Sequence, residues 1–220
     1  MTPAAFPAPP LTTLSTSNVD TFMVLVPLRA DADIRNDLTA ARMREASAEV
    51  AVRQAKDVQA RAKAHIEVKK KEIELTKSRI DAAKKAQNAV DAGAFESQKK
   101  VLERELKLLE RRSQLYAAEV ELGEAVRDAA RSRAKACERE MDLALKRQEI
   151  AALSRGALSQ GTVAQAVQMS AQLNDLEKKT LEAMRDMAGK EADTAQKEKK
   201  IAERRLAILE AQRTLSRQGQ

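Results

Sequence analysis

The sequence predicts an all-α fold: an elongated antiparallel coiled coil or three-long-helix bundle that follows a disordered, Pro-rich N-terminus. Three observations carry this prediction. Apolar pairs recur every seven residues from 101 to 151, all five prolines lie at or before Pro27, and 2% of the 220 residues are aromatic whereas 33% are charged. A strict heptad repeat keeps one side of a helix turned toward its partners over many turns. Because few aromatic residues are available for a thick core, we expect a rod.

Residues 1–30 form a Pro/Ser/Thr-rich segment that is expected to be flexible and to end in a short apolar strap, Phe22 to Leu28. Three interpretations of the strap remain open: an extended segment on the bundle, a staple beside the first helix, or an insertion at a membrane surface. The sequence shows neither a standard signal peptide nor a transmembrane segment. We therefore expect a soluble or peripheral protein, and the compartment is not indicated.

The helical rod is expected over residues 31–217, and its first helix over about 31–90. Asp31 and Asp33 suit the positive end of the helix dipole. One heptad series contains larger residues and the other small ones that permit close approach: Leu38, Val52, Ile66, Ile73 and Ile80, against Ala41, Ala48, Ala55, Ala62 and Ala83. We place the turn at Gly93, which can adopt the left-handed conformation. A helix running through Gly93 is the alternative, because glycine costs only about 1 kcal/mol relative to alanine there.

The second helix, about 95–153, carries the strict repeat. Its proposed packing seam is Leu102, Leu108, Leu109, Leu115, Tyr116, Leu122, Leu143 and Ile150. A stripe this wide is broader than the seam of a two-stranded coiled coil, so it predicts contact with at least two other helices.

A second turn is expected between Ser154 and Thr162, where two glycines lie and where Thr162 and Gln165 have capping-box spacing. The third helix, about 163–216, is assigned a looser stripe: Val167, Leu173, Leu176, Leu181, Met184, Ala188, Ala195, Ala202, Leu206 and Leu209. Short connections between long helices favour an up-down-up rod, whose most exposed face would be closed by dimerisation or by stacking into a filament.

The second turn also carries a family resemblance. Residues 153–160, together with Ala164, Ala166 and Leu173, resemble the helical-hairpin tip of periplasmic adaptor proteins from tripartite efflux and secretion systems. The likeness covers about thirty residues. Those families also have lipoyl and β-barrel portions, and this chain has no segments typical of the strands they need. The resemblance implies a helical hairpin and, as one function, an adaptor of an envelope or secretion assembly.

No catalytic, cofactor-binding or metal-binding constellation is predicted. His65 and Cys137 are the sole residues of their types; Cys137 lies on the heptad stripe and is interpreted as a buried thiol. The glycines do not form a phosphate-binding loop. The sequence therefore favours a protein that is not an enzyme, with no cofactor and no small-molecule substrate.

The net charge is +7; residues 1–34 carry −2, so the helical body carries +9. This excess favours an anionic membrane surface or an acidic protein as partner, while the lack of aromatic stacking platforms disfavours nucleic acid. The alternative is a solvated helix face whose charge keeps the rod soluble, because almost every basic pair has Glu or Asp close by. Candidate contacts with an acidic partner are the basic pairs Lys70, Lys71, Lys84, Lys85, Lys99, Lys100, Arg111, Arg112, Lys199, Lys200, Arg204 and Arg205.

The pattern as a whole favours a structural or scaffold coiled-coil protein that self-associates through its wide heptad stripe, as an oligomer or filament, and presents basic faces to a partner. The alternatives are a peripheral membrane-binding or membrane-remodelling helical protein, and a helical adaptor. The sequence specifies neither the oligomer number nor the identity of the partner.

Overall fold

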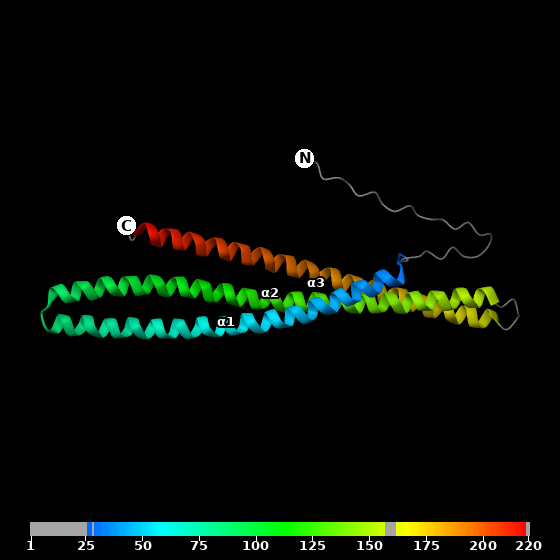
Figure 1. The fold of residues 1–220 in the computed structure, drawn as a ribbon, viewed down its shortest axis with the longest axis horizontal. Helices are drawn as coiled ribbons and strands as arrows, with labels where there is room; N and C mark the ends of the chain where they lie inside the picture. The colour runs from blue at the N-terminus through cyan, green and yellow to red at the C-terminus, as the bar shows by residue number, and fades with distance from the viewer. Residues whose placement is uncertain (1–25, 28, 157–161, 219–220) are drawn as a thin grey trace, which may run out of the picture.

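The computed structural model confirms the all-α fold with three long helices (Figure 1): α1 (Asp31–Lys85), α2 (Ala89–Gly156) and α3 (Thr162–Gln218). It describes residues 26–27, 29–156 and 162–218, with side chains omitted for 153–156, 162–167 and 215–218. The expected flexible segment up to residue 25 and the centre of the second turn, 157–161, lie outside the described residues. At 68 residues, α2 is about 100 Å long.

The long middle helix organises the molecule. Both α1 and α3 pack on α2, and within the described residues the backbones of α1 and α3 do not contact each other. Figure 1 shows the result: α1 and α2 form one hairpin, α2 and α3 form a second that opens at the other end, and the two overlap in the middle. The prediction that the second helix contacts two others is confirmed.

Ion pairs show that both antiparallel pairings keep their heptad register. Between α1 and α2, salt bridges of 2.9 Å join Arg42 to Glu138, Lys56 to Glu124 and Lys84 to Glu96. Each step of 14 or 28 residues along α1 is matched by the same step backward along α2. Between α2 and α3, the pairs Arg147–Glu177, Arg133–Glu191 and Glu119–Arg205 follow the same rule in steps of 14. Flanking charges of this kind fix register and orientation in coiled coils.

The paired apolar repeat of α2 consists of two adjacent seams. Gly123, the second member of its pair, lies against Val52 of α1, so positions at heptad spacing from it share the α1 side of the helix. The Ser132 hydroxyl donates to Asp186 of α3 at 2.8 Å, which places the opposite edge of the stripe on the α3 side. One wide stripe therefore serves two partners.

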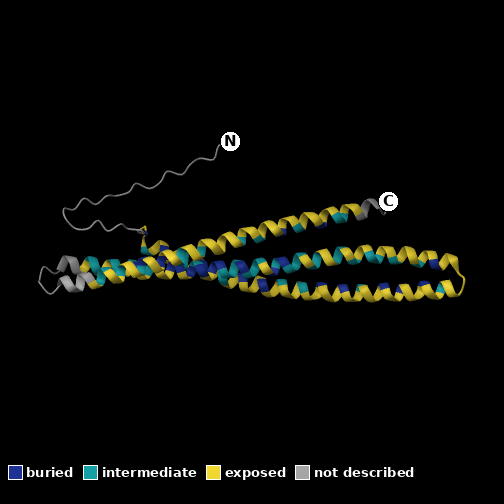
Figure 2. Cartoon of the chain, turned by 180° about the vertical axis from the view of Figure 1, so that it is seen from behind, coloured by how far each residue is buried: buried dark blue, intermediate teal, exposed yellow. Residues whose placement is uncertain are grey.

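The densest packing lies in the middle of α2, where both partners overlap (Figure 2). Of the α2 residues whose side chains are described, twelve are buried. Eleven of these fall between Ala118 and Leu143, and seven of the eleven are alanine or cysteine. Small side chains let three helices approach closely. Of the proposed seam residues, Leu143 is 1% exposed. The other seven, Leu102, Leu108, Leu109, Leu115, Tyr116, Leu122 and Ile150, are half-buried.

Most of the first seam matches the sequence analysis. Seven of its ten proposed residues are buried: Ala41, Ala48, Val52, Ala62, Ile66, Ile73 and Ile80. The other three, Leu38, Ala55 and Ala83, are half-buried. Thr76, a polar residue in the same series, is also buried, and its hydroxyl donates to the Glu72 carbonyl at 2.8 Å. Because the hydroxyl is satisfied within its own helix, the seam accepts it.

The first turn lies at 86–88, so the expectation that it falls at Gly93 was wrong. Gln87 takes the left-handed conformation with φ 55°, and the amides of Gln87 and Asn88 donate to the carbonyls of Lys84 and Ala83. This is a Schellman motif without glycine. The Asn88 side chain then accepts from the Asp91 amide at 3.2 Å, which caps α2. Gly93 lies inside α2, so α1 ends about five residues earlier than expected and α2 begins about six residues earlier.

The stripe assigned to the third helix was also largely wrong. Leu173, Leu176 and Met184 are half-buried, but Leu181, Ala188, Ala195, Ala202, Leu206 and Leu209 are exposed, and the side chain of Val167 lies outside the described residues. The face that packs on α2 is the heptad series one position earlier: Thr180, Met187, Thr194, Ile201 and Ile208. Its polar members are satisfied; the Thr180 hydroxyl, for example, donates to the Leu176 carbonyl at 2.7 Å.

Alanine substitutions at Gly93 and Gly123 of α2 should change the free energy of unfolding in opposite directions. A Cβ at Gly93 would meet nothing within 4 Å, whereas a Cβ at Gly123 would come within 2.8 Å of the Val52 Cγ2 atom. Gly93→Ala should raise the free energy of unfolding by about 0.5–1 kcal/mol. Gly123→Ala should lower it by about 1–3 kcal/mol, because stiff Val52 cannot move aside.

Thermal or urea unfolding measures both changes. Adding Val52→Ala to Gly123→Ala removes the clashing methyl groups, so the double variant should lose less stability than the two single losses added together. A Gly123→Ala variant that is as stabilised as Gly93→Ala would refute close packing at this position.

Candidate functional site: a polar junction and a basic half

A polar junction joins the N-terminal segment to α2 and α3. Val26 is buried, and its carbonyl accepts from the Arg147 Nη2 atom at 3.1 Å. The same guanidinium nitrogen lies 2.5 Å from the Glu177 Oε1 atom of α3. Both charged side chains are nearly buried, so their interaction is little weakened by solvent. Arg147 thus ties three segments together.

Arg29 makes a second link at this junction. Its Nη2 atom lies 2.5 Å from the Asp37 Oδ2 atom, and its Nη1 atom lies 3.2 Å from the Glu140 Oε2 atom of α2. The hydrogen bond from Arg29 lowers the pKa of Asp37. Glu140 is 5% exposed, and its Oε1 atom has no hydrogen-bond partner among the described residues. Arg29 is therefore the cation that compensates a buried carboxylate.

The buried Val26 lies outside any helix, and its carbonyl contacts the α2–α3 hairpin through Arg147. The other proposed strap residues, Phe22 to Leu25 and Leu28, lie outside the described residues. Sequence reasoning missed Arg29, Glu140 and Arg147. The only signal of Glu140 and Arg147 was a charged residue at a seam-flanking position, which is common on any coiled coil. Arg29 precedes the first helix, so no heptad position could single it out.

Cys137 and His65, the two residues considered as candidates for chemistry, lie in different environments. Cys137 is buried, and desolvation raises the pKa of its thiol. A raised thiol pKa means a low thiolate fraction and low reactivity. His65 is exposed on α1. Among the described residues, no three His, Cys, Asp or Glu side chains come together as a metal site requires.

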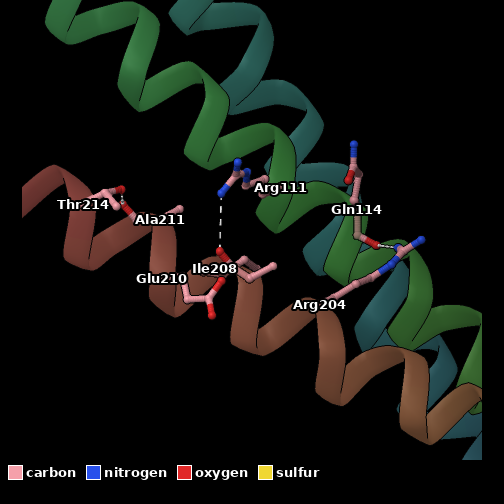
Figure 3. Close-up of a pocket in the computed structure, with 8 residues that line it drawn as sticks. Arg111, Gln114, Arg204, Ile208, Glu210, Ala211 and Thr214 are labelled. Carbon is pink, nitrogen blue, oxygen red and sulfur yellow. Dashed lines mark hydrogen bonds between the residues drawn. The ribbon is translucent and has the colours of Figure 1, made fainter.

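An open cleft lies between α2 and the far part of α3 (Figure 3). It has a volume of about 470 Å³ and is lined by Arg111 and Gln114 from α2 and by Arg204, Ile208 and Thr214, among others, from α3. Arg111 donates to the Ala207 carbonyl at 3.4 Å, and Arg204 donates to the Gln114 carbonyl. Two of the basic residues proposed as partner contacts therefore bridge the helices instead of standing free.

Several other proposed partner contacts are engaged within the chain. Five of them form ion pairs: Lys70 with Glu67, Lys84 with Glu96, Lys99 with Glu103, Lys200 with Glu121, and Arg205 with Glu119. The hydrogen bond to Glu96 raises the pKa of Lys84. The remaining five proposed contacts form no ion pair with any described residue: Lys71, Lys85, Lys100, Arg112 and Lys199.

The fold gathers the net charge at one end of the rod. The Val52–Gly123 contact marks the middle of the α1–α2 hairpin, and Lys200 of α3 pairs with Glu121 close beside it. Residues 53–123 and 197–218, here called the basic half, carry 24 lysines and arginines against 15 aspartates and glutamates. The remaining residues carry 16 against 18. All twelve proposed contacts lie in the basic half, although they come from three segments of sequence.

No family model, curated protein or solved structure shows significant similarity to the chain. Among the helices as described, none combines the length and the hydropathy of a membrane span. Function must therefore be argued from the surfaces of the rod.

The junction gives a testable prediction. Arg147→Met leaves Glu177 buried without a cation and the Val26 carbonyl without that donor, so it should lower the free energy of unfolding by about 3–5 kcal/mol. In Arg147→Met/Glu177→Leu both charges are gone, and most of that loss should be recovered. Urea unfolding of the two variants and of Glu177→Leu completes the cycle. Equal losses in Arg147→Met and in the double variant would contradict a coupled pair.

Proposed function

We propose that the protein is a non-enzymatic scaffold: a coiled-coil rod that self-associates and presents its basic half to a partner. The observation that carries self-association is the outer row of α3, defined as Leu181, Ala188, Ala195, Ala202 and Leu209. These apolar residues recur every seven positions and are exposed. Leu206, beside the row, is 59% exposed, and Leu209 is 54% exposed. A heptad row of this kind is typical of a helix that contacts another helix.

A second copy of the chain is the occupant that we favour. The wide stripe of α2, which the sequence analysis assigned to self-association, is covered by α1 and α3 within the chain. The outer row of α3 is not covered within the chain, so it is available for a contact with a second molecule. It spans 29 residues, or about 42 Å. A two-fold contact sets the row against the same row of a second molecule, so alanines meet leucines or alanines and no complementary partner has to be supplied.

The mechanism of such a scaffold is geometric. Because the hairpin register is fixed by ion pairs along both seams, the rod holds its ends at a set separation. A contact through α3 leaves α1 on the other side of α2 free for a partner. The basic half would then attract an acidic surface, as concentrated charge of one sign does.

Light scattering coupled to size exclusion tests self-association across a wide range of protein concentrations. We expect a mass that rises with concentration above the 24.2 kDa of the monomer. Leu206→Gln/Leu209→Gln should weaken association at least about tenfold. Each substitution removes a leucine side chain whose burial would contribute about 1.5–3 kcal/mol to the free energy of association.

Val50→Gln/Leu145→Gln is the matched control, since Val50 and Leu145 have similar exposure and lie off the row. The control should associate like the unaltered chain. A protein that stays monomeric at every concentration would contradict the proposal, as would equal weakening by the control. A mass that keeps rising without a plateau would identify a filament, and a fixed multiple a discrete oligomer.

A further inference from the structure

One face of α1 within the basic half differs from the rest of the rod surface. The outer stripe of α1 consists of the residues two positions after the seam positions 59, 62, 66, 69, 73, 76, 80 and 83, of which Gln59 and Lys69 are half-buried polar members. These stripe residues are Arg61, Ala64, Val68, Lys71, Leu75, Ser78, Ala82 and Lys85. A step of two residues turns about 200° around the helix, so the stripe lies opposite the seam. All eight residues are exposed, and none is acidic. Over about 36 Å, the stripe itself carries only cationic, aliphatic and small side chains. The exposed acidic residues Glu67, Glu74 and Asp81 lie in the row beside it.

The cations of the stripe are available. In the row next to the seam, Lys56, Lys70 and Lys84 are paired with glutamates. Arg61, Lys71 and Lys85, by contrast, form no ion pair with any described residue. Acidic residues lie one helical turn away from each of them, Asp57 from Arg61, Glu67 and Glu74 from Lys71, and Asp81 from Lys85. The three cations are nevertheless not held in ion pairs, and they contribute to the net positive charge of the half in which they lie.

The stripe also exposes large aliphatic side chains between its cations. Val68 is 56% exposed and Leu75 is 55% exposed, and they lie one heptad apart with Lys71 between them. Of eleven large hydrophobic residues exposed in the described structure, seven lie in the basic half. Solvated cationic faces do not require such residues, whereas a bilayer interface accommodates both kinds of side chain.

We propose that the outer stripe of α1 docks on the surface of an anionic lipid bilayer. Val68 and Leu75 enter the boundary between headgroups and acyl chains, and Arg61, Lys71 and Lys85 contact the anionic headgroups. The helix lies in the plane of the surface and does not cross it. The opposite face of α1 remains packed on α2, so docking requires no unfolding of the rod.

The chemistry of the stripe favours a bilayer over nucleic acid. Binding of single strands relies on aromatic side chains on which bases stack, and the stripe has none. The aromatic residues of the basic half, Phe95 and Tyr116, are half-buried on α2. Aliphatic side chains gain nothing from a phosphate backbone but gain from transfer into the lipid boundary.

Docking does not depend on the proposed self-association. In the described structure α1 and α3 lie on different sides of α2 and make no backbone contact, so the outer row of α3 and the outer stripe of α1 are separate surfaces. A monomer can therefore bind lipid, and an oligomer can fail to do so. The two proposals fail independently.

Vesicle co-sedimentation of the full chain tests the proposal. The unaltered protein should bind vesicles that contain phosphatidylserine and phosphatidylcholine, should not bind phosphatidylcholine alone, and should bind less as salt rises. Lys71→Gln/Lys85→Gln should weaken binding about 25-fold, at about fivefold for each basic residue near an anionic surface. Val68→Ser/Leu75→Ser keeps the charge and should also weaken binding severalfold.

Arg35→Gln/Arg44→Gln is the matched control. Both arginines are exposed on the same helix but lie outside the basic half, and the variant loses the same charge. It should bind nearly as well as the unaltered protein, and circular dichroism should show equal helicity for all variants. No binding to anionic vesicles at low salt would overturn the proposal. So would equal weakening by the control, an unchanged Val68→Ser/Leu75→Ser variant, or tighter binding to a DNA or RNA duplex than to vesicles at the same salt.

Discussion

The structure depends on one helix packing against two partners at the same time. In the middle of α2, between Ala118 and Leu143, adjacent edges of a single stripe face α1 and α3. This arrangement requires small side chains, because three backbones must approach closely. The middle of α2 is accordingly rich in alanine, and at Gly123 even a Cβ would come too close to Val52. It also requires strict periodicity, since a slip of one residue would turn both seams away from their partners. The flanking ion pairs hold that register along both hairpins.

The architecture could be predicted from sequence because heptad spacing determines which residues share a helix face. The α1 seam and the two-partner stripe of α2 follow from spacing alone. The first turn could not be placed, because Gln87 adopts a conformation that glycine prefers, while Gly93 sits in a regular helix. The informative signal was Asn88 with Asp91 three residues later, a polar cap at the start of a helix.

The third helix shows a different limit of sequence reasoning. It carries two heptad rows one position apart, and the more apolar row is the exposed one. Hydrophobicity alone selects the wrong row. The row that packs on α2 is the one that contains Thr180, Ile201 and Ile208. Polar residues beside this row have partners on α2: Glu177 meets Arg147, Asp186 meets Ser132, and Arg205 meets Glu119. Such matches depend on how two distant segments align, which one sequence read along its length does not reveal.

The same fold creates the surfaces on which the functional proposals rest. The excess of lysine and arginine comes from two segments far apart in sequence, residues 53–85 of α1 and 197–218 of α3, which meet in one half of the rod, and the other half is close to neutral. The outer row of α3 and the outer stripe of α1 point to different neighbours, a second copy and an anionic bilayer. The polar junction around Arg147 sits outside the basic half and joins the N-terminal segment to the helices. The shared α2 brings the basic segments of α1 and α3 into the same half and holds the two outer surfaces apart.

Native-state hydrogen exchange along α2 tests that sharing most directly, because amides exchange most slowly where opening exposes the most packed surface. Slowest exchange should fall between Ala118 and Leu143, with faster exchange toward residue 95, where α2 is covered on the α1 side. Uniform protection along the whole of α2, or an α3 that exchanges like an unpacked helix while α1 and α2 stay protected, would contradict a helix shared between two seams.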